Sequence, residues 1–235
     1  MTTADRFAGL YLLDRFRLEH GATSVDVCAG GQRLLAYLGL RRHATRAVLA
    51  GTLWPDATEE RAHGSLRTTL WRLHRECPPI VRSGGDTLSL EDTVHVDARA
   101  LGESALSVVR STGSLGGEPA LDLLFSGDLL PGWYEDWVLF ERERLRQLRL
   151  HALDSVAEHL AAQGQHALAL EAALESVRME PLRESAHRAV VSIHLAEHNI
   201  AEAVRHYQAF RTLLLAELGV EPSVQFFAMM RHAMT

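Results

Sequence analysis

The stretch "ERAHGSLRTTLWRLHREC", Glu60–Cys77, decides the fold of the first part of the chain. Its apolar residues recur every three or four positions, which predicts an amphipathic helix with one buried face. These residues are Ala62, Leu66, Leu70 and Leu73. The stretch also holds four arginines and two histidines against two acids, although the formal net charge of the 235-residue chain is −6. We therefore expect one locally basic helix on an acidic protein.

Positive charge is concentrated around this helix, and the excess of acid lies elsewhere. Residues 1–97 hold 12 arginines and 12 acids, whereas residues 98–235 hold 12 arginines and 18 acids. Residues 33–55 hold four arginines and no acid. Local patches of this kind suit a polyanion such as a nucleic acid, whereas the net charge of the whole chain does not.

Composition and motifs argue against an enzyme, a cofactor or a metal site. All 24 basic residues are arginine, so the chain has neither a Walker phosphate loop nor a Schiff-base lysine. No Gly-x-Ser-x-Gly elbow of a serine hydrolase is present. His194 and His198 are four residues apart, but the glutamate of a zinc-protease motif is out of position between them. We expect no catalysis, no cofactor and no bound metal.

The chain has the features of a cytoplasmic protein. Cys28 and Cys77 form no C-x-x-C pair, which fits a reducing compartment. The N-terminus lacks the basic start and the clean apolar run of a signal peptide. Nowhere are the roughly 18 consecutive apolar residues of a membrane span found. We expect no membrane partner.

Short strands and two helices are expected before the basic helix. Residues Leu10–Val27 alternate apolar and polar side chains around Gly21, which predicts a hairpin. Helical spacing of leucines follows the Gly30-Gly31 break. A second short helix is expected to begin after Thr45, as its N-cap, and to stop at Pro55.

The basic helix has predicted limits and a predicted hairpin after it. The sequence Asp56-Ala57-Thr58-Glu59 has the form of a capping box, and Pro78-Pro79 ends the helix. Two alternating strands then meet at Gly84-Gly85-Asp86, which predicts a wing that carries Arg82. Strands, three helices and a hairpin, in this order, are typical of a winged helix-turn-helix domain.

After Asp97 the pattern becomes wholly helical, with one flexible insertion expected at Ser111–Pro119. The stretches "LAAQGQHALA" from Leu160 and "LAEHNIAEAV" from Leu195 align 35 residues apart, close to the tetratricopeptide period of about 34 residues. Helix breaks are expected near Gln163-Gly164, Glu180-Pro181, His198-Asn199 and Glu221-Pro222.

The predicted fold is therefore mainly α and has two domains. Residues 1–97 are expected to form a winged helix-turn-helix (α+β) domain. Residues 98–235 are expected to form an all-α, tetratricopeptide-like domain. A tetratricopeptide-like adaptor, in which the winged helix binds protein and not DNA, is the alternative.

Several side chains have both a packing and a functional interpretation. A basic stripe on a helix is most often a solvated surface, but this one lies on the helix that enters the major groove in winged-helix domains. We expect Trp71 to pack against the protein. Gly64 is expected to permit close approach of a neighbouring helix or of the DNA backbone.

Two features of the second part are assigned to structure. The aromatic residues of the connection before the long helical region are expected to close the core of the helical domain, with a ligand pocket as the alternative. They are Trp133, Tyr134, Trp137 and Phe140. The arginines and glutamates between Glu141 and Arg149 are expected to pair with each other at i,i+4 spacing, with a second nucleic-acid surface as the minority interpretation.

Seven stretches, taken together, resemble one known family. In the first part they are "GGQRLLAYLGL", "LAGTLWPD", "RAHGSLRTTLWRLHRE" and "VRSGGDTLSL"; in the second they are "LLPGWYEDWVLFERERLRQLRLHAL", "MEPLRESAHRAVV" and "LLAELGVEPS". The chain is similar over nearly its whole length to the SARP-type antibiotic-regulatory activators of actinomycetes. These proteins join an OmpR-type winged helix to a bacterial transcriptional activation domain (BTAD) of tetratricopeptide-like helices.

The resemblance implies a transcriptional activator that binds direct repeats in double-stranded DNA and recruits RNA polymerase, as a homodimer or as side-by-side protomers. Its recognition helix falls on Arg61–Arg75, which places Arg67, Thr68 and Arg72 first among the groove contacts. The resemblance also implies phosphate contacts from three residues outside that helix. The full set of expected DNA-binding residues is Thr45, Arg46, Arg61, Ser65, Arg67, Thr68, Arg72, Arg75 and Arg82.

Overall fold

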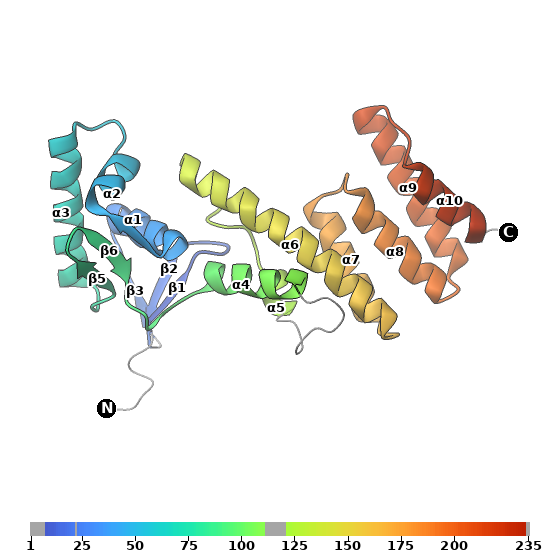
Figure 1. Cartoon of the computed structure of the whole chain (residues 1–235), viewed down its shortest axis with the longest axis horizontal. Coiled ribbons are helices and arrows are strands. Elements are labelled where there is room, and N and C mark those ends of the chain that lie inside the picture. Colours follow the sequence, from blue (N-terminus) through green and yellow to red (C-terminus); the bar gives the residue numbers. More distant parts are fainter. Residues whose placement is uncertain (1–7, 22, 111–120, 234–235) are drawn as a thin grey trace. The chain divides into compact units, whose positions relative to one another are not determined.

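The computed structural model describes residues 8–21, 23–110 and 121–233 and divides into two compact units (Figure 1). Unit 1 comprises Met1–Leu101 and Ser126–Arg144, and unit 2 comprises Gly102–Phe125 and Leu145–Thr235. The predicted boundary at residue 97 separates two functional domains. The compact units divide the chain differently, because residues 126–144 belong to unit 1, so the functional boundary stays a prediction. The predicted insertion at Ser111–Pro119 lies outside the described residues.

Unit 1 begins with a four-stranded sheet in the order β3-β2-β1-β7. Its strands are β1 (Ala8–Tyr11), β2 (Arg17–His20), β3 (Thr23–Val25) and β7 (Val94–Val96). The predicted hairpin is confirmed, because β2 and β3 pair antiparallel around Gly21, whose φ is +59°. The residues of β7 were predicted as part of the second strand of the hairpin, because the alternation continues to Asp97. In the structure β7 is a separate strand that pairs parallel to β1, with Leu10 opposite Val96.

Three helices follow: α1 (Ala29–Arg41), α2 (Arg46–Leu53) and α3 (Glu59–Glu76). Thr45 caps α2 as predicted, because its hydroxyl accepts a hydrogen bond from the Val48 N–H at 3.3 Å. The capping box predicted for α3 is wrong. The N-cap is Thr58, and its side chain makes no capping hydrogen bond. Helix α3 ends at Glu76, before the two prolines.

The buried face of α3 is the one that the apolar spacing predicts. Ala62, Leu66, Leu70 and Leu73 are all buried, in contact with a core to which α1 and α2 contribute further leucines. Burial of a leucine side chain stabilises a fold by about 2 kcal/mol, so this face fixes the rotation of α3 about its axis. The arginines of the helix are thereby turned outward.

A second sheet, of order β4-β6-β5, completes the winged helix. Its strands are β4 (His43–Thr45), β5 (Val81–Gly84) and β6 (Thr87–Leu90). The hairpin β5–β6 turns at Gly85-Asp86 as predicted, and Gly85 has a φ of +65°. Strand β4 was not predicted; it places the start of α2 beside the hairpin, because Thr45 lies opposite Thr87.

The segment Ser126–Arg144 is anchored to unit 1 through backbone carbonyls and aromatic rings. The backbone N–H of Leu130 donates to the Leu12 carbonyl at 2.8 Å, and the N–H of Asp14 donates to the Asp128 carbonyl at 2.9 Å. Within the segment, the guanidinium of Arg142 donates to the carbonyl oxygens of Leu129 at 2.7 Å, Leu130 at 2.6 Å and Trp133 at 3.0 Å. The ring of Trp137 packs edge-on against Tyr37 of α1, with centroids 5.3 Å apart.

The predicted role of the aromatic cluster is therefore wrong in two respects. Trp133 and Trp137 pack in unit 1, and Trp133 stacks with Phe16. Tyr134 and Phe140 do not belong to a core, since their side chains are 78% and 73% exposed. Sequence alone did not separate them because Trp133 and Tyr134 precede α6, in a connection that has no periodic pattern to show which side chain is buried.

The described residues of unit 2 form helices and short connections, and the helices break where the sequence predicts. They are the end of α4 (Asp97–Arg110), α5 (Leu121–Leu124), the second part of α6 (Asp136–Ala162), α7 (His166–Met179), α8 (Glu184–Ala196), α9 (Ile200–Leu218) and α10 (Val224–Ala233). Helices α7 to α10 lie side by side in chain order (Figure 1). Within the part of the chain that the structure describes, no helix is long and apolar enough to cross a bilayer.

The helical repeat has a period of 34 residues, which corrects the sequence alignment at 35. The turns before α7 and α9 have the same geometry: Gly164 and His198, 34 positions apart, have φ values of +76° and +60°. The N–H of Gln165 bonds to Leu160 O at 2.9 Å, and that of Asn199 to His194 O at 2.8 Å. A 34-residue period is that of tetratricopeptide repeats.

Candidate nucleic-acid interface

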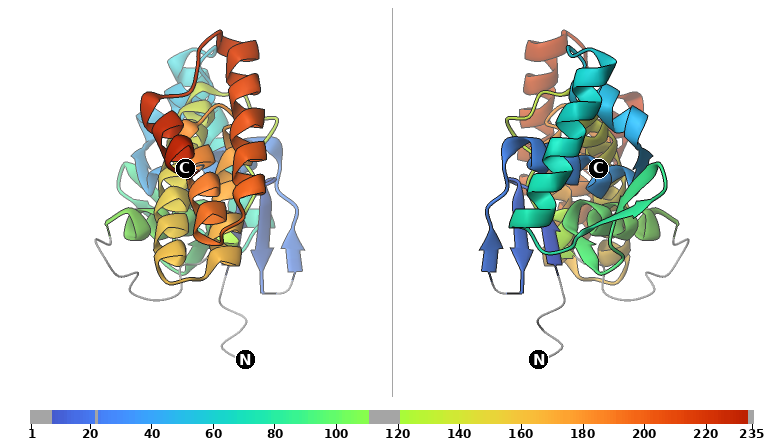
Figure 2. Two further views of the ribbon diagram at one scale, coloured as in Figure 1. Left: turned by 90° about the vertical axis from the view of Figure 1, so that its right-hand side faces the viewer. Right: turned by 90° about the vertical axis from the view of Figure 1, so that its left-hand side faces the viewer.

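Between its acidic ends, α3 carries seven exposed side chains, and this helix faces the viewer in the right-hand view of Figure 2. They are Arg61, Arg67, Thr68, Trp71, Arg72, His74 and Arg75, while Ser65 on the same helix is half-buried and the exposed acids Glu59, Glu60 and Glu76 lie at the two ends. Positions four apart on a helix lie one above the other, so Arg67, Trp71 and Arg75 form one row. The structure thus brings together the recognition-helix residues that the sequence predicts.

These four arginines have their charge available for a partner. Among the described residues, none of Arg61, Arg67, Arg72 and Arg75 forms an ion pair or donates a hydrogen bond. Each guanidinium carries five N–H donors in a planar fork that matches phosphate oxygens or the O6 and N7 atoms of guanine. An exposed row of unpaired guanidinium groups is the electrostatic footprint of a surface that binds a polyanion.

The hydroxyl of Thr68 is already engaged within the helix. Its Oγ1 donates to the Gly64 carbonyl at 3.0 Å, so its hydrogen is not available to a ligand. The oxygen keeps its capacity to accept. In a major groove Thr68 would therefore read a donor, such as an adenine or cytosine amino group, and not an acceptor.

Trp71 is a correction to the sequence prediction. It does not pack in the protein: its side chain is 59% exposed. Its described ring contact is with Arg75, whose guanidinium carbon lies 5.2 Å from the ring centroid, within the range of a cation–π interaction. The α3 face is therefore both cationic and, at one position, strongly apolar.

Among the described residues, no neighbouring helix lies close to Gly64, so the first of its two predicted roles, close helix packing, is wrong. A Cβ atom built there would meet only the Nη2 of Arg67, at 3.8 Å, which is ordinary van der Waals contact. A glycine inside a helix costs about 1 kcal/mol relative to alanine. Packing within the described residues does not explain this cost, and the predicted role toward DNA remains.

The start of α2 and the β5–β6 hairpin are tied to each other. Arg46 donates from Nη2 to the Ser83 hydroxyl at 3.1 Å, and its backbone N–H donates to the Asp86 carbonyl at 2.9 Å. Thr45 is exposed beside it, at the N-terminus of α2, where backbone N–H groups favour an anion. These contacts fix the wing relative to the two helices.

Arg82 is engaged in a way the sequence did not reveal. Its guanidinium forms two parallel hydrogen bonds to the carboxylate of Asp92, at 3.0 and 3.2 Å. This hydrogen-bonded carboxylate raises the pKa of Arg82 above its usual range. Both side chains are exposed, so the pair is open to exchange with a phosphate, but Arg82 brings less unbalanced charge than the arginines of α3.

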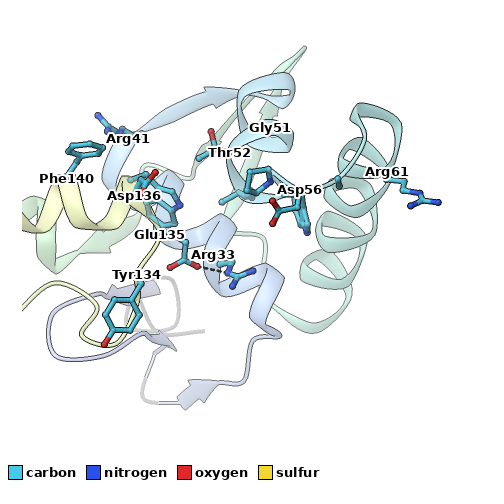
Figure 3. Close-up of a pocket in the computed structure, with 15 residues that line it drawn as sticks. Arg33, Arg41, Gly51, Thr52, Asp56, Arg61, Tyr134, Glu135, Asp136 and Phe140 are labelled. Atoms are coloured by element: carbon cyan, nitrogen blue, oxygen red, sulfur yellow. Dashed lines mark ion pairs between the residues drawn. The ribbon is translucent and has the colours of Figure 1, made fainter.

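Unit 1 also contains a groove of about 940 Å³ (Figure 3), lined in part by Tyr134, Trp137 and Phe140, three of the aromatic residues for which a ligand pocket was the alternative. It is lined by α1, by the connection from α2 to α3 and by residues 134–140. In Figure 3 Arg33 turns toward Glu135, and the ion pair between them measures 2.8 Å. Arg41 similarly pairs with Glu141 at 3.2 Å. Arg61 also lines the groove, but with Arg33 and Arg41 paired and with Asp56 and Asp136 in the lining, the groove has no excess of positive charge.

Groups of three or more histidine, cysteine or acidic side chains that could hold a metal ion are absent from the described residues. The fold thus defines a class of proteins in which a winged-helix unit is followed by a tetratricopeptide-like array of helices. The profile of the bacterial transcriptional activator domain matches residues 110–232, more than half of the chain. The chain belongs to the bacterial transcriptional activator domain family, and the predicted SARP-type resemblance is confirmed.

Two known proteins are similar to this chain. The regulatory protein AfsR of Streptomyces coelicolor is 32% identical over 201 residues, which cover 80% of this chain and 20% of AfsR. This chain thus spans about a fifth of the length of that relative. The structure of Mycobacterium tuberculosis EmbR, in complex with a low-affinity phosphopeptide, matches with a TM-score of 0.73 at 16% identity. That match covers 97% of this chain and 65% of EmbR, and it confirms the fold class.

Proposed function

We propose that this protein is a transcriptional regulator that binds specific DNA sequences by placing α3 in the major groove. One observation carries the proposal: four arginines point outward from one helix of a winged-helix unit, and none is ion-paired within the described residues. The exposed acids of α3, Glu59, Glu60 and Glu76, lie at its two ends and none lies between Arg61 and Arg75, whereas a surface evolved only for solubility would have acids interspersed among the arginines. Membership of the family supports the same proposal.

In the proposed complex, phosphate contacts orient the protein and base contacts select the sequence. Arg67, Thr68 and Arg72 face base edges, with Arg61, Ser65 and Arg75 beside them. Thr45, Arg46 and the wing residue Arg82 contact phosphate. The N-terminus of α2 supports this role for Thr45, and the hydrogen bond from Arg46 to Ser83 holds α2 and the wing in one register. Residues 1–97 form the DNA-binding domain of the proposal.

The finer proposal is that the protein activates transcription. It binds direct repeats near promoters as a homodimer or as side-by-side protomers, and residues 98–235 recruit RNA polymerase. Stacked helix pairs of the tetratricopeptide type offer protein-binding surfaces, which supports assigning protein contacts to this part. The family's description as an activator domain supports the same division.

The test is a fluorescence anisotropy titration of the full chain against duplex DNA from the region upstream of its own gene. Arg46 and Arg82, which contact phosphate in the proposed complex, release counterions on binding, so these two contacts alone are expected to lower the affinity about tenfold between 50 and 200 mM salt. A scrambled duplex of equal composition is the control. Binding that is equal for both duplexes, or insensitive to salt, would contradict the proposal.

A second candidate, the adaptor that binds protein and not DNA, is favoured by one feature of unit 2. A groove of about 570 Å³ lies between α9 and α10, and the α10 side chains Val224 and Phe227 beside it are 79% and 54% exposed. Exposed apolar patches of this kind mark protein contacts. The adaptor predicts that the anisotropy titration detects no complex with either duplex.

A further inference from the structure

We propose that Trp71 is a specificity-determining residue that contacts thymine methyl groups in the major groove. The inference rests on the proposed function, since it concerns the same face of α3. Trp71 is the one large apolar side chain among the exposed residues of that face, and it is 59% exposed. An aromatic ring left in water on a face of arginines gains nothing for the fold, but it gains apolar contact in a complex.

The position of Trp71 puts it within reach of base edges. It follows Arg67 by four residues and precedes Arg75 by four, so the three side chains form one row along the helix. A helix rises about 1.5 Å per residue, which places neighbours in this row about 6 Å apart. Base pairs are about 3.4 Å apart along the duplex. When Arg67 lies at one base edge, Trp71 therefore faces the groove about two base pairs farther along.

The chemistry of the major groove narrows what an indole can read there. Guanine, cytosine and adenine present polar donors and acceptors, whereas thymine also presents its C5-methyl group, the apolar feature of the groove. A half-exposed indole ring buries that methyl and discriminates against cytosine at the same step. The contact is with an apolar group, so it adds sequence selection without adding charge.

Arg75 strengthens the assignment because it holds the ring in place. Its guanidinium carbon is 5.2 Å from the indole centroid, so a cation covers part of one ring face. The rotamer of Trp71 is then restricted before DNA arrives, and less conformational entropy is lost on binding. The same pair places a cation directly beside the apolar ring that contacts the base.

The experiment compares the full wild-type chain with Trp71→Ala, Trp71→Phe and the matched control Tyr134→Ala, an aromatic residue that is 78% exposed outside α3. Preferred duplexes are first selected by each protein from a random-sequence library. In the duplex selected by the wild type, each thymine is then replaced by uracil, which removes only the methyl group. Binding is measured by anisotropy at fixed salt.

For the wild type we expect uracil to weaken binding about fourfold at one or two positions, the effect of exposing one buried methyl group. Trp71→Ala is expected to bind thymine and uracil duplexes equally and to lose the preference at those positions, whereas Trp71→Phe and Tyr134→Ala keep it. If uracil costs the wild type nothing, or Trp71→Ala selects the same sequence, the role of Trp71 is overturned while DNA binding stands. If the wild type selects no sequence, both proposals fail.

Discussion

Helices α3 and α6 each carry four arginines within a short stretch, and the two sets are used in opposite ways. On α3, Arg61, Arg67, Arg72 and Arg75 face outward, and none of them is ion-paired among the described residues. On α6, the corresponding set is Arg142, Arg144, Arg146 and Arg149. Every member of that second set has a described partner within the chain.

The partners on α6 are mostly not those that helical spacing predicts. Arg142 bonds to loop carbonyls, and Arg146 pairs with Glu180 of the turn before α8 at 2.6 Å. Arg144 pairs with Glu141 at i,i+3, not i,i+4. Arg149 is 4% exposed and bonds to the Leu124 carbonyl. The comparison teaches that arginine content does not identify a binding surface; the supply of acceptors around each guanidinium does.

The largest effect that tests this comparison is expected from Arg149→Met. The substitution leaves the Leu124 carbonyl without its charged donor and removes a cation 3.8 Å from buried Glu175. We expect a loss of about 3 kcal/mol in the free energy of unfolding. Urea denaturation followed by circular dichroism measures it.

The matched control is Arg67→Met on α3, an equal change of side chain at an exposed, unpaired position. Its free energy of unfolding is expected to stay within about 0.5 kcal/mol of the wild type. Similar losses in both variants would mean that the α3 arginines also support the fold, and the comparison between the two helices would be broken.

The second effect concerns DNA binding, for which the arginine of α3 is expected to matter more than the arginine of α6. Arg67→Ala is expected to weaken binding to the selected duplex by about 1–3 kcal/mol, the value of one bidentate contact to guanine. Binding to a scrambled duplex should change much less. Arg144→Ala on α6 is the control for loss of one positive charge, and anisotropy titrations of the two variants give the answer. Equal losses in the two variants would show that only net charge matters.

The buried faces could be predicted from the sequence because apolar spacing and burial follow the same helical period. Leu66 and Leu70 of α3 are examples. The breaks between α6 and α10 could also be predicted, because glycine, proline and asparagine mark the ends of helices. The helix repeat was one residue out of register, because similar letters align at 35 whereas the turn geometry at Gly164 and His198 repeats at 34. An alignment compares residue types, whereas the structural repeat is defined by the backbone dihedral angles of the turns.

The fate of individual side chains on the surface was not predictable in the same way. Trp71 and Tyr134 are exposed although aromatic, and Arg142 is held by carbonyls of a loop nine to thirteen residues earlier in the chain. Whether a guanidinium or an indole finds a partner depends on loop carbonyls and neighbouring helices, and these positions have no periodic signal in the sequence. The pairing of Arg82 with Asp92 was missed because these residues are ten positions apart, on either side of the β5–β6 hairpin turn, and no sequence pattern links them.

The third effect concerns two histidines of unit 2, His187 and His206, that are held in the neutral form. His187 Nε2 donates to the Pro181 carbonyl at 2.9 Å, so its Nδ1 accepts from His206 Nε2, also at 2.9 Å. Burial lowers the pKa of His187, and burial together with neighbouring His187 and His194 lowers the pKa of His206 to about 4. Both rings are therefore neutral in the folded protein at neutral pH.

The pKa values of both histidines in the folded protein lie below the unfolded value of about 6.5. The stability that the neutral pair contributes is therefore fully present above a pH of about 6.5. It is lost as the pH falls toward about 4, because the unfolded chain binds protons first. We expect a loss on the order of 1 kcal/mol, since His206 is only partly buried. Urea denaturation at pH 7.5 and pH 4.5 measures the difference, and His206→Phe should reduce it. An unchanged difference in that variant would assign the acid sensitivity to other groups.

The smallest effect is expected from Gly64→Ala, which separates what the fold requires from what α3 offers to a partner. The added methyl meets only Arg67 at 3.8 Å, and alanine is the better helix former, so the free energy of unfolding should rise by about 0.5–1 kcal/mol. If the glycine is kept for the approach of a DNA backbone, the more stable variant must bind the selected duplex more weakly. Thermal unfolding measures the stability of the variant, and anisotropy measures its affinity for the duplex. The control is Gly51→Ala, at an exposed position of α2 where a Cβ meets no atom within 4 Å. Higher stability with unchanged affinity would leave Gly64 without a role in binding and confine the interface to the arginine row.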